Sequence, residues 1–191
     1  MKRLVVIGVM CVMVMGIART AAAQDDPAKV EIGGGWQYQS LRINDDESWE
    51  HFKYGWWADG SFHLTGMWSA VGQVSGMYKT LTEQEGEIDV KLHPYLGGVR
   101  VTSRRNPKAA IFGQFLVGAA NLKLSLGSES VSDTMFAYQV GGGANVAISG
   151  RLAARVGGDY LRIMPGDGSD IAEEALHGFR LSAGLVYGFG S

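Results

Sequence analysis

The residues with the broadest chemical range in this chain are its four histidines, His51, His63, His93 and His177. Imidazole can act as a general base, a proton donor or a metal ligand. None of the four has a partner at metal-ligand spacing, and the chain has no HExxH, P-loop or Gly-x-Ser-x-Gly motif. The sequence therefore predicts no catalytic residue, no cofactor-binding residue and no metal site, and we expect that the protein is not an enzyme.

A second chemically capable group consists of ionisable residues that recur at alternate positions of regular segments. They are Glu31, Asp59, His63, Lys91, Arg100, Arg155, Asp159 and Arg180. Ions removed from water are tolerated only in pairs or networks, and this set holds both signs. We therefore expect one structural polar network around a central axis, in which Arg155 and Arg180 pair with Glu31 and Asp159.

The segments that carry these residues alternate with period two, which is typical of β-strands with two different faces. No long run of helical spacing follows Val30. Eight runs are expected as strands: Val30–Ser40, Trp56–Leu64, Trp68–Lys79, Val90–Thr102, Ala110–Leu122, Thr134–Ile148, Leu152–Leu161 and Gly178–Phe189. The phase of Ala110–Leu122 is ambiguous. In Val90–Thr102, Leu92 and Leu96 oppose Lys91 and His93, with a register break expected at Gly97–Gly98.

The connections between the runs alternate in length. Long connections are expected at 41–55, 80–89, 123–133 and 162–175, and short ones at 65–67, 103–109 and 149–151. Outer-membrane barrels have an even number of strands, with short periplasmic turns and long extracellular loops. The fold class predicted from this pattern is all-β, an eight-stranded antiparallel up-and-down transmembrane β-barrel.

Alternation alone does not say which face is inside, because a soluble barrel shows the same period. Aromatic residues near the strand ends favour the membrane, where they form girdles at the two interfaces. The expected girdle consists of Trp36, Tyr38, Trp56, Trp68, Tyr78, Tyr160 and Phe179. We therefore expect apolar side chains outside and ionic ones in the lumen, with a soluble secreted barrel as the alternative.

The N-terminus has the parts of a secretory signal. Lys2 and Arg3 precede an apolar run that ends at Ile17, and an Ala21-Ala22-Ala23 cleavage site follows. Residues 1–23 are expected to be a cleaved signal peptide and 24–191 the barrel domain. Cleavage removes the only cysteine, Cys11. The whole chain has a net charge of -2, which excludes an electrostatically driven nucleic-acid binder.

The last strand carries Ser182, Gly184, Tyr187 and Phe189, an arrangement that resembles the assembly signal of outer-membrane barrels. Gly190 and Ser191 follow the final aromatic, where that signal usually ends. Together with Gly141-Gly142-Gly143 and Asp159-Tyr160, the mature chain resembles the small outer-membrane β-barrel domain family, the OmpX-like and OmpA-transmembrane-domain-like group. The resemblance implies a fold and an assembly route, with the assembly machinery and periplasmic chaperones as partners.

The function expected from these features is that of an integral outer-membrane barrel with a plugged polar lumen, serving envelope integrity or surface contact. A narrow channel for ions or small solutes is the alternative. A lipid A-modifying enzyme is a third reading, in which His177 would act beside Glu173 and Glu174. We expect a monomer in contact with outer-membrane lipid and lipopolysaccharide.

Acidic residues gather in three of the expected long loops, and basic ones in the short turns. The acidic set is Asp45, Asp46, Glu47, Glu50, Glu83, Glu85, Glu87, Asp89, Asp167, Asp170, Glu173 and Glu174; the basic set is Arg104, Arg105, Lys108 and Arg151. Solubility of exposed loops is one explanation. Divalent cations bridging the acidic loops to lipopolysaccharide phosphates are the functional alternative.

Overall fold

The computed structural model describes residues 28–42, 49–83, 86–106, 108–126, 129–166 and 175–190, and this part of the chain consists of strands and their connections. The strands are β1 (Val30–Arg42), β2 (Trp49–Thr65), β3 (Trp68–Glu83), β4 (Gly86–Asn106), β5 (Ala109–Leu126), β6 (Glu129–Ser149), β7 (Leu152–Met164) and β8 (Leu176–Phe189). No apolar helix of membrane-spanning length occurs among these residues. The expected signal peptide lies outside the described residues.

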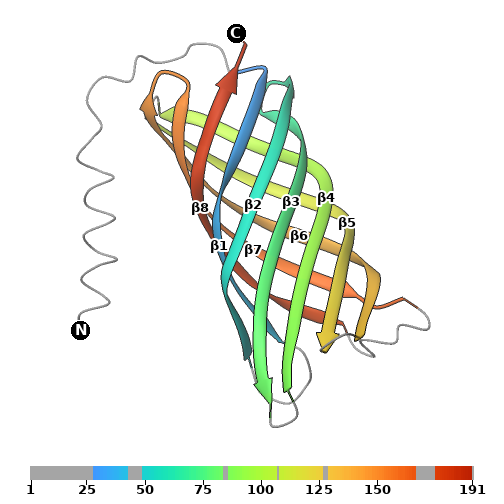
Figure 1. Cartoon of the computed structure of the whole chain (residues 1–191). Coiled ribbons are helices and arrows are strands. Elements are labelled where there is room, and N and C mark those ends of the chain that lie inside the picture. Colours follow the sequence, from blue (N-terminus) through green and yellow to red (C-terminus); the bar gives the residue numbers. More distant parts are fainter. Residues whose placement is uncertain are drawn as a thin grey trace, which may run out of the picture.

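The eight strands form one closed sheet (Figure 1). Each strand pairs antiparallel with the next, and β1 pairs antiparallel with β8 over its whole length, from Val30 opposite Phe189 to Arg42 opposite His177. Closure pairs both edges of each strand along the body of the barrel, whereas residues 79–83 of β3 and 129–135 of β6 lack a described partner on β2 and β7. The structure therefore confirms the predicted eight-stranded up-and-down barrel.

Tight turns close one end of the barrel. Gly66 and Gly150 lie in the connections from β2 to β3 and from β6 to β7, with φ of +54° and +46°. These angles fall in the left-handed region, which glycine adopts without the steric cost that a Cβ imposes. Two of the expected short connections are thus two-residue turns that depend on glycine.

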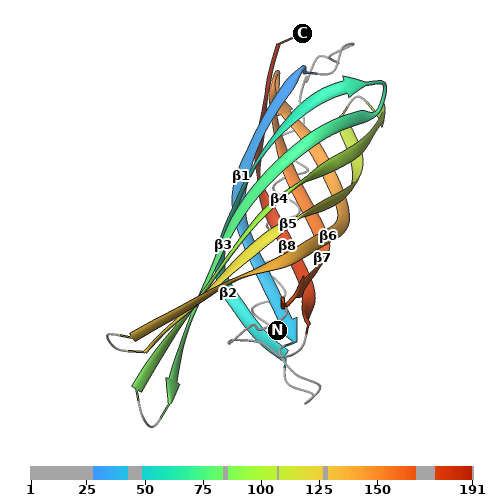
Figure 2. The same ribbon diagram turned by 90° about the vertical axis from the view of Figure 1, so that its right-hand side faces the viewer.

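At the opposite end, the strands in the middle of the chain extend further than the sequence predicts. β4 and β6 each have 21 residues, whereas β1 and β7 have 13. β3 continues to Glu83 and β5 to Leu126, so the long connections expected at 80–89 and 123–133 were wrong. Figure 2 shows these hairpins projecting beyond the rest of the barrel. We call this the long end, and the opposite one the turn end.

Polar residues at the long end continue the strand pairing. Thr80 lies opposite Asp89 across β3 and β4, and its Oγ1 donates a hydrogen bond to Asp89 Oδ1 at 2.9 Å. Glu50, expected in a loop, lies in β2 and forms an ion pair with Lys79. The acidic residues at 45–47, 85, 167, 170, 173 and 174 lie outside the described residues, so only part of the acidic set can be placed.

Large apolar side chains cover the outer wall. Trp36 is 50% exposed, Leu181 59% and Tyr187 44%, although all three lie within strands. The phase of β5, ambiguous from the sequence, is resolved: Phe112, Gln114 and Leu116 are buried inside, and Ile111, Phe115 and Val117 are exposed outside. A soluble barrel would bury its large apolar face, so this orientation is that of a barrel in lipid.

In the first half of β4, the side chains expected to face the interior face outward, so this part of the prediction was wrong. Leu92 is 1% exposed and Leu96 5%, and both share the inner face with Arg100, which is 2% exposed. The pairing of β4 with β3 runs through Gly97 and Gly98 without a shift in register. Lys91 therefore points to the outer wall, contrary to its expected place in the lumen. The strand alternates without a break, and the polarity of its two faces reverses instead.

The polarity of the two faces of β4 reverses because the interior of the barrel is apolar towards the long end and polar towards the middle. The buried apolar cluster lies towards the long end, where β1, β3, β5 and β7 finish and the other strands begin; it includes Leu41, Phe52, Met77, Leu92, Leu122, Met135, Leu161, Ile163 and Leu176. Towards the middle the interior is polar. Polar side chains were expected along the whole lumen, whereas the interior towards the long end is apolar.

Candidate functional site

Asp59 is the centre of the buried polar cluster. It lies near the middle of β2 and is 5% exposed. Its Oδ2 accepts hydrogen bonds from Arg100 Nη2 at 2.5 Å and from Arg155 Nη1 at 2.6 Å. Arg100 comes from β4 and Arg155 from β7, so one carboxylate joins three strands and opposes two positive charges.

A second ion pair lies between neighbouring strands. Asp159 of β7 and Arg180 of β8 are direct partners in register. The guanidinium donates to Asp159 Oδ2 from Nη2 at 2.7 Å and from Nε at 3.1 Å. Its remaining Nη1 donates to Gln37 Oε1 and Gln73 Oε1, each at 3.2 Å. Arg180 thereby connects β8 with β1, β3 and β7.

Gln114 of β5 joins these two ion-pair groups. Its Oε1 accepts from Arg100 Nη2 at 2.8 Å and from Nε at 3.1 Å. Its Nε2 donates to Asp159 Oδ1 at 2.9 Å. An amide has both donor and acceptor atoms, so a single glutamine can satisfy a cation on one side and an anion on the other.

Arg155 extends the cluster towards the turn end. Its Nε donates to Asn145 Oδ1 of β6 at 2.8 Å, and its Nη2 lies 3.5 Å from Glu31 Oε2 of β1. Glu31 also pairs with Arg104 at 3.3 Å. Arg155 with Glu31, and Arg180 with Asp159, are the two pairings expected from the sequence. Every strand of the barrel contributes a side chain to this cluster.

One aromatic ring packs against both of the arginines that share Asp59. The Phe112 ring centroid lies 4.8 Å from the Arg100 guanidinium carbon and 5.0 Å from that of Arg155, and Trp57 lies 5.8 Å from Arg155. Desolvated cation–π contacts contribute about 2 kcal/mol each. The rings therefore offset part of the repulsion between two neighbouring guanidinium groups.

A glycine leaves room for the central carboxylate. A Cβ added at Gly33 would lie 2.6 Å from Asp59 Oδ1, whereas one added at Gly60, on the outer face of β2, would meet nothing within 4 Å. Side chains fill the interior so fully that the cavity between Trp57, Asp59, Gln114, Arg155 and Asp159 is about 10 Å³. That is roughly the space of one water molecule.

The structure brings together six of the eight residues expected in the lumen: Glu31, Asp59, Arg100, Arg155, Asp159 and Arg180. His63 lies on the inner face of β2 towards the turn end, and its Nδ1 has no hydrogen-bond partner among the described residues. Lys91 faces outward. Sequence reasoning missed Gln37, Gln73 and Gln114, although all three fall on the inward phase of their strands.

The expected girdle residues lie on the outer wall. Trp36, Trp56, Trp68, Tyr78 and Phe179 are exposed, and Tyr38 and Tyr160 partly so. Several interact in pairs: Trp56 Nε1 donates to the Tyr78 hydroxyl at 3.1 Å, and the Tyr38 hydroxyl lies 2.8 Å from His51 Nδ1. Trp68 lies near the turn end and Tyr78 nearer the long end, so two levels of the wall carry aromatic rings.

The expected assembly signal occupies β8. Tyr187 and Phe189 are exposed on the outer wall, with ring centroids 4.8 Å apart. Ser182 and Gly184 alternate with them towards the interior, where Ser182 Oγ donates to the Gly157 carbonyl at 3.4 Å. The four residues thus present two faces of the strand that closes the barrel against β1.

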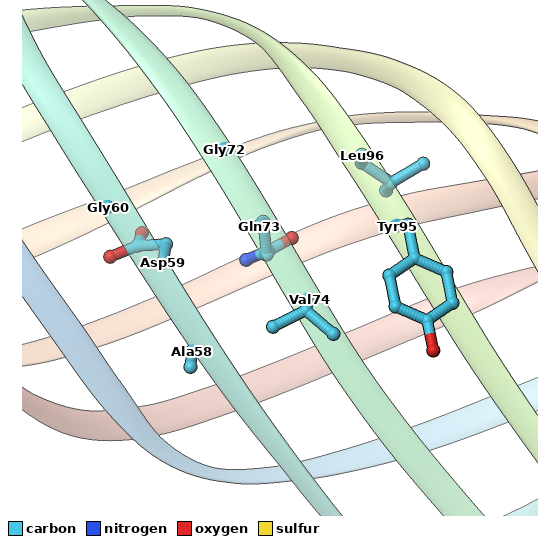
Figure 3. Close-up of a pocket in the computed structure, with 8 residues that line it drawn as sticks. All are labelled: Ala58, Asp59, Gly60, Gly72, Gln73, Val74, Tyr95 and Leu96. Carbon is cyan, nitrogen blue, oxygen red and sulfur yellow. The ribbon is translucent and has the colours of Figure 1, made fainter.

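One hollow in the described part of the wall is lined mainly by small and apolar residues. It has a volume of about 400 Å³ and lies across β2, β3 and β4, where Gly60 and Gly72 leave open space outside the sheet (Figure 3). Asp59 and Gln73 contribute to its floor, but both side chains are buried. Among the described residues no three His, Asp or Glu side chains are placed to hold a metal ion.

Comparison with known proteins identifies the family. The model of the family described as outer membrane protein beta-barrel domain matches residues 8–189. None of the curated proteins matches the chain in sequence. Neisserial surface protein A is similar in structure, with a TM-score of 0.71 at 11% identity over 86% of this chain and 100% of that chain.

Two further solved structures share the architecture. Ail, the attachment invasion locus protein of Yersinia pestis, has a TM-score of 0.56 at 14% identity over 85% of this chain and 100% of that one. The outer membrane protein OprG of Pseudomonas aeruginosa has a TM-score of 0.51 at 9% identity, over 86% of this chain and 97% of that chain. At these identities the likeness concerns the fold alone. The family match spans nearly the whole chain, so this protein belongs to the outer membrane protein β-barrel domain family and is an outer-membrane protein.

Proposed function

We propose that this protein is a closed, non-conducting barrel that presents its long end at the cell surface, for envelope integrity or contact. The observation that carries the proposal is the ionic cluster, which draws a side chain from every strand and leaves a cavity of only about 10 Å³. An eight-stranded barrel is just wide enough for side chains to fill it.

The buried apolar cluster is a second reason to expect that the lumen does not conduct ions. Side chains such as Leu92, Leu161 and Ile163 are at most 1% exposed and lie between the ionic cluster and the long end. An ion that crossed this layer would leave water without finding a polar partner, which is costly. Two consecutive barriers of different chemistry therefore oppose conduction.

Planar-bilayer recording tests closure against the alternative of a narrow channel. The refolded chain is expected to give no steady, long-lived conductance steps, while a conducting porin added to the same bilayer shows that insertion events are detected. Heat-modifiable mobility on SDS gels confirms that the sample is a folded barrel. Steady openings in the folded sample would replace this proposal with the channel.

Surface display depends on which end faces outward. Long projections at one end and tight turns at the other are the arrangement of extracellular and periplasmic sides in this class of barrel. Single-cysteine variants at two exposed residues, Ser130→Cys at the tip of the long end and Arg151→Cys at the turn end, separate the two orientations. In intact cells a membrane-impermeant maleimide is expected to label the variant at 130 and not the one at 151; the reverse would overturn the orientation.

Export and assembly complete the proposal. Residues 1–23 direct secretion and are removed after Ala23, and the outward aromatic residues Tyr187 and Phe189 present the assembly signal. The intact mass of the purified outer-membrane protein is expected to correspond to a chain that begins at Gln24. Replacement of Phe189 by Ala is expected to lower the amount of folded barrel in cells while leaving refolding in detergent intact.

A further inference from the structure

A row of positive charge lies on the outer wall near the long end. Lys91 of β4 and Lys123 of β5 are direct partners in register, and their neighbours Leu92 and Leu122 point inward. Both lysines therefore project from the same face of the sheet, outside the barrel. Opposed Cα atoms in an antiparallel pair are only about 5 Å apart.

A second row of basic residues lies on the outer wall over a different set of strands, β7, β8 and β1. Arg162 of β7 is the register partner of His177 of β8, which in turn is the partner of Arg42 of β1. Leu161, Ile163 and Leu176 are buried on the inner face, so Arg162 and His177 also project outward. Three neighbouring strands thus place basic side chains side by side at this level.

The facing lysines Lys91 and Lys123 are unfavourable unless an anion lies against them. Like charges directly opposite each other destabilise a strand pair. Within the described parts of the chain, Lys91, Lys123 and Arg162 take part in no ion pair. Asp59 and Asp159 are turned inward to the buried cluster, whereas Asp89 lies two residues from Lys91 on the same face of β4 and accepts a hydrogen bond from Thr80, so one carboxylate faces two lysines. The wall therefore has a local excess of positive charge.

The level of these rows along the barrel indicates what the anion is. Lys91 lies beside the girdle residue Tyr78, its register partner on β3, and the Tyr160 ring lies 6.2 Å from the His177 ring. Aromatic girdles mark the level where acyl chains meet head groups. Cations at the girdle, on the side towards the long end, are level with lipid phosphates.

We propose that the Lys91–Lys123 pair, and the Arg162–His177 pair, bind phosphate groups of lipopolysaccharide in the leaflet that surrounds the long end. The lipid A part of this glycolipid carries phosphates close to its acyl chains, so chains can pack on the aromatic wall while phosphates meet the cations. The sites lie on the outer wall, so the inference does not depend on whether the lumen conducts, but it rests on the proposed orientation with the long end at the cell surface.

Binding of lipid A to the folded, detergent-solubilised chain tests this directly. The immobilised protein is incubated with bisphosphorylated lipid A, dephosphorylated lipid A or phosphatidylglycerol, and the retained lipid is quantified by mass spectrometry. Each lysine near an anionic lipid surface contributes about 1 kcal/mol, so the site formed by Lys91 and Lys123 is expected to bind bisphosphorylated lipid A about thirtyfold more weakly in the double variant Lys91→Gln/Lys123→Gln. Total retention by this variant is then expected to fall to what the site at Arg162 binds alone. Arg162→Gln is expected to weaken binding about fivefold.

The matched control removes two positive charges from the turn end. Lys29 and Arg151 are exposed there, and Lys29→Gln/Arg151→Gln is expected to bind lipid A as the unaltered protein does. Heat-modifiable mobility shows that each variant is folded. Equal retention by the Lys91/Lys123 variant and the unaltered protein would overturn the proposed site. Equal retention of phosphatidylglycerol or dephosphorylated lipid A would overturn the assignment to lipopolysaccharide phosphates.

Discussion

Arg180 and Asp159 are neighbours across β8 and β7, and two guanidinium nitrogens of Arg180 donate to one carboxylate oxygen of Asp159 at 2.7 and 3.1 Å. Both side chains are buried, at 3% and 5% exposure. The pair thus locks the register of two adjacent strands from inside the barrel, at a position where neither group can be solvated in the folded state.

A double-mutant cycle measures this lock. Asp159→Asn and Arg180→Gln each leave a buried charge without its partner, so each is expected to lower the free energy of unfolding by about 3–5 kcal/mol. The double variant is expected to lose less than the sum of the two, with a coupling energy of about 1–3 kcal/mol. Urea unfolding in lipid vesicles, followed by tryptophan fluorescence, provides the values. Strict additivity would show that the pair does not act as a unit.

Asp59 is expected to be more important still, because it is the shared acceptor of two arginines. Asp59→Asn leaves Arg100 and Arg155 close together without their common anion, and the free energy of unfolding is expected to fall by at least about 3–5 kcal/mol. Asp89→Asn is the control. Asp89 lies outside the buried cluster and accepts a hydrogen bond from Thr80, so its loss is expected to cost about 1 kcal/mol or less. Similar losses for both variants would contradict the central role of Asp59.

Alanine substitutions at two glycines, one facing the Asp59 carboxylate and one facing outward, test how tightly the interior is packed around Asp59. Gly33→Ala would place a methyl group 2.6 Å from Asp59 Oδ1, so the carboxylate must move away from its arginines and stability is expected to fall by about 1–3 kcal/mol. Gly60→Ala meets open space and is expected to be neutral, or stabilising by up to about 1 kcal/mol. The urea concentration at the midpoint of unfolding, measured for each variant and for the unaltered protein, gives the change in stability. A larger loss for Gly60→Ala would be the opposite of what the geometry requires.

Two single-cysteine variants, at the adjacent positions 91 and 92, test which face of β4 points outward. The only native cysteine is Cys11, within the expected signal peptide, so single-cysteine variants of the mature chain are free of background. In the folded barrel, cysteine at position 91 is expected to react rapidly with a polar maleimide and cysteine at position 92 slowly, because Leu92 is 1% exposed. After unfolding in urea both are expected to react at similar rates. Faster labelling at 92 would restore the orientation first expected from the sequence.

How far the sequence predicts this structure depends on the residues concerned. Trp36, Leu181 and Tyr187 lie on faces of one consistent polarity, so periodicity alone places them on the outer wall. The number of strands and their antiparallel order follow from the same signal. Six of the eight expected lumenal residues meet in the ionic cluster, because their charges require partners once the apolar face is turned to lipid.

The misplaced residues of β4 have one cause, which is that the polarity of each face changes along the barrel axis. Leu92 is inside and Lys91 outside because the interior is apolar towards the long end and the outer wall there leaves the hydrocarbon. A rule that assigns apolar residues to lipid therefore fails beyond the girdle. The glutamines were missed for another reason: Gln37 and Gln114 carry no charge, so nothing in the composition distinguishes them from exposed polar residues.

The central claim is that apolar side chains face lipid while the other face of each strand fills the lumen, and the neighbours Trp56 and Trp57 test it most directly. Trp56 is 40% exposed on the outer wall, and Trp57 is 3% exposed beside Arg155. Two single-tryptophan variants, each keeping one of these residues and carrying Phe at the other four tryptophan positions, are refolded into vesicles of lipids with brominated acyl chains. We predict strong quenching of Trp56 fluorescence and little quenching of Trp57. Equal quenching of both, or stronger quenching of Trp57, would contradict the account.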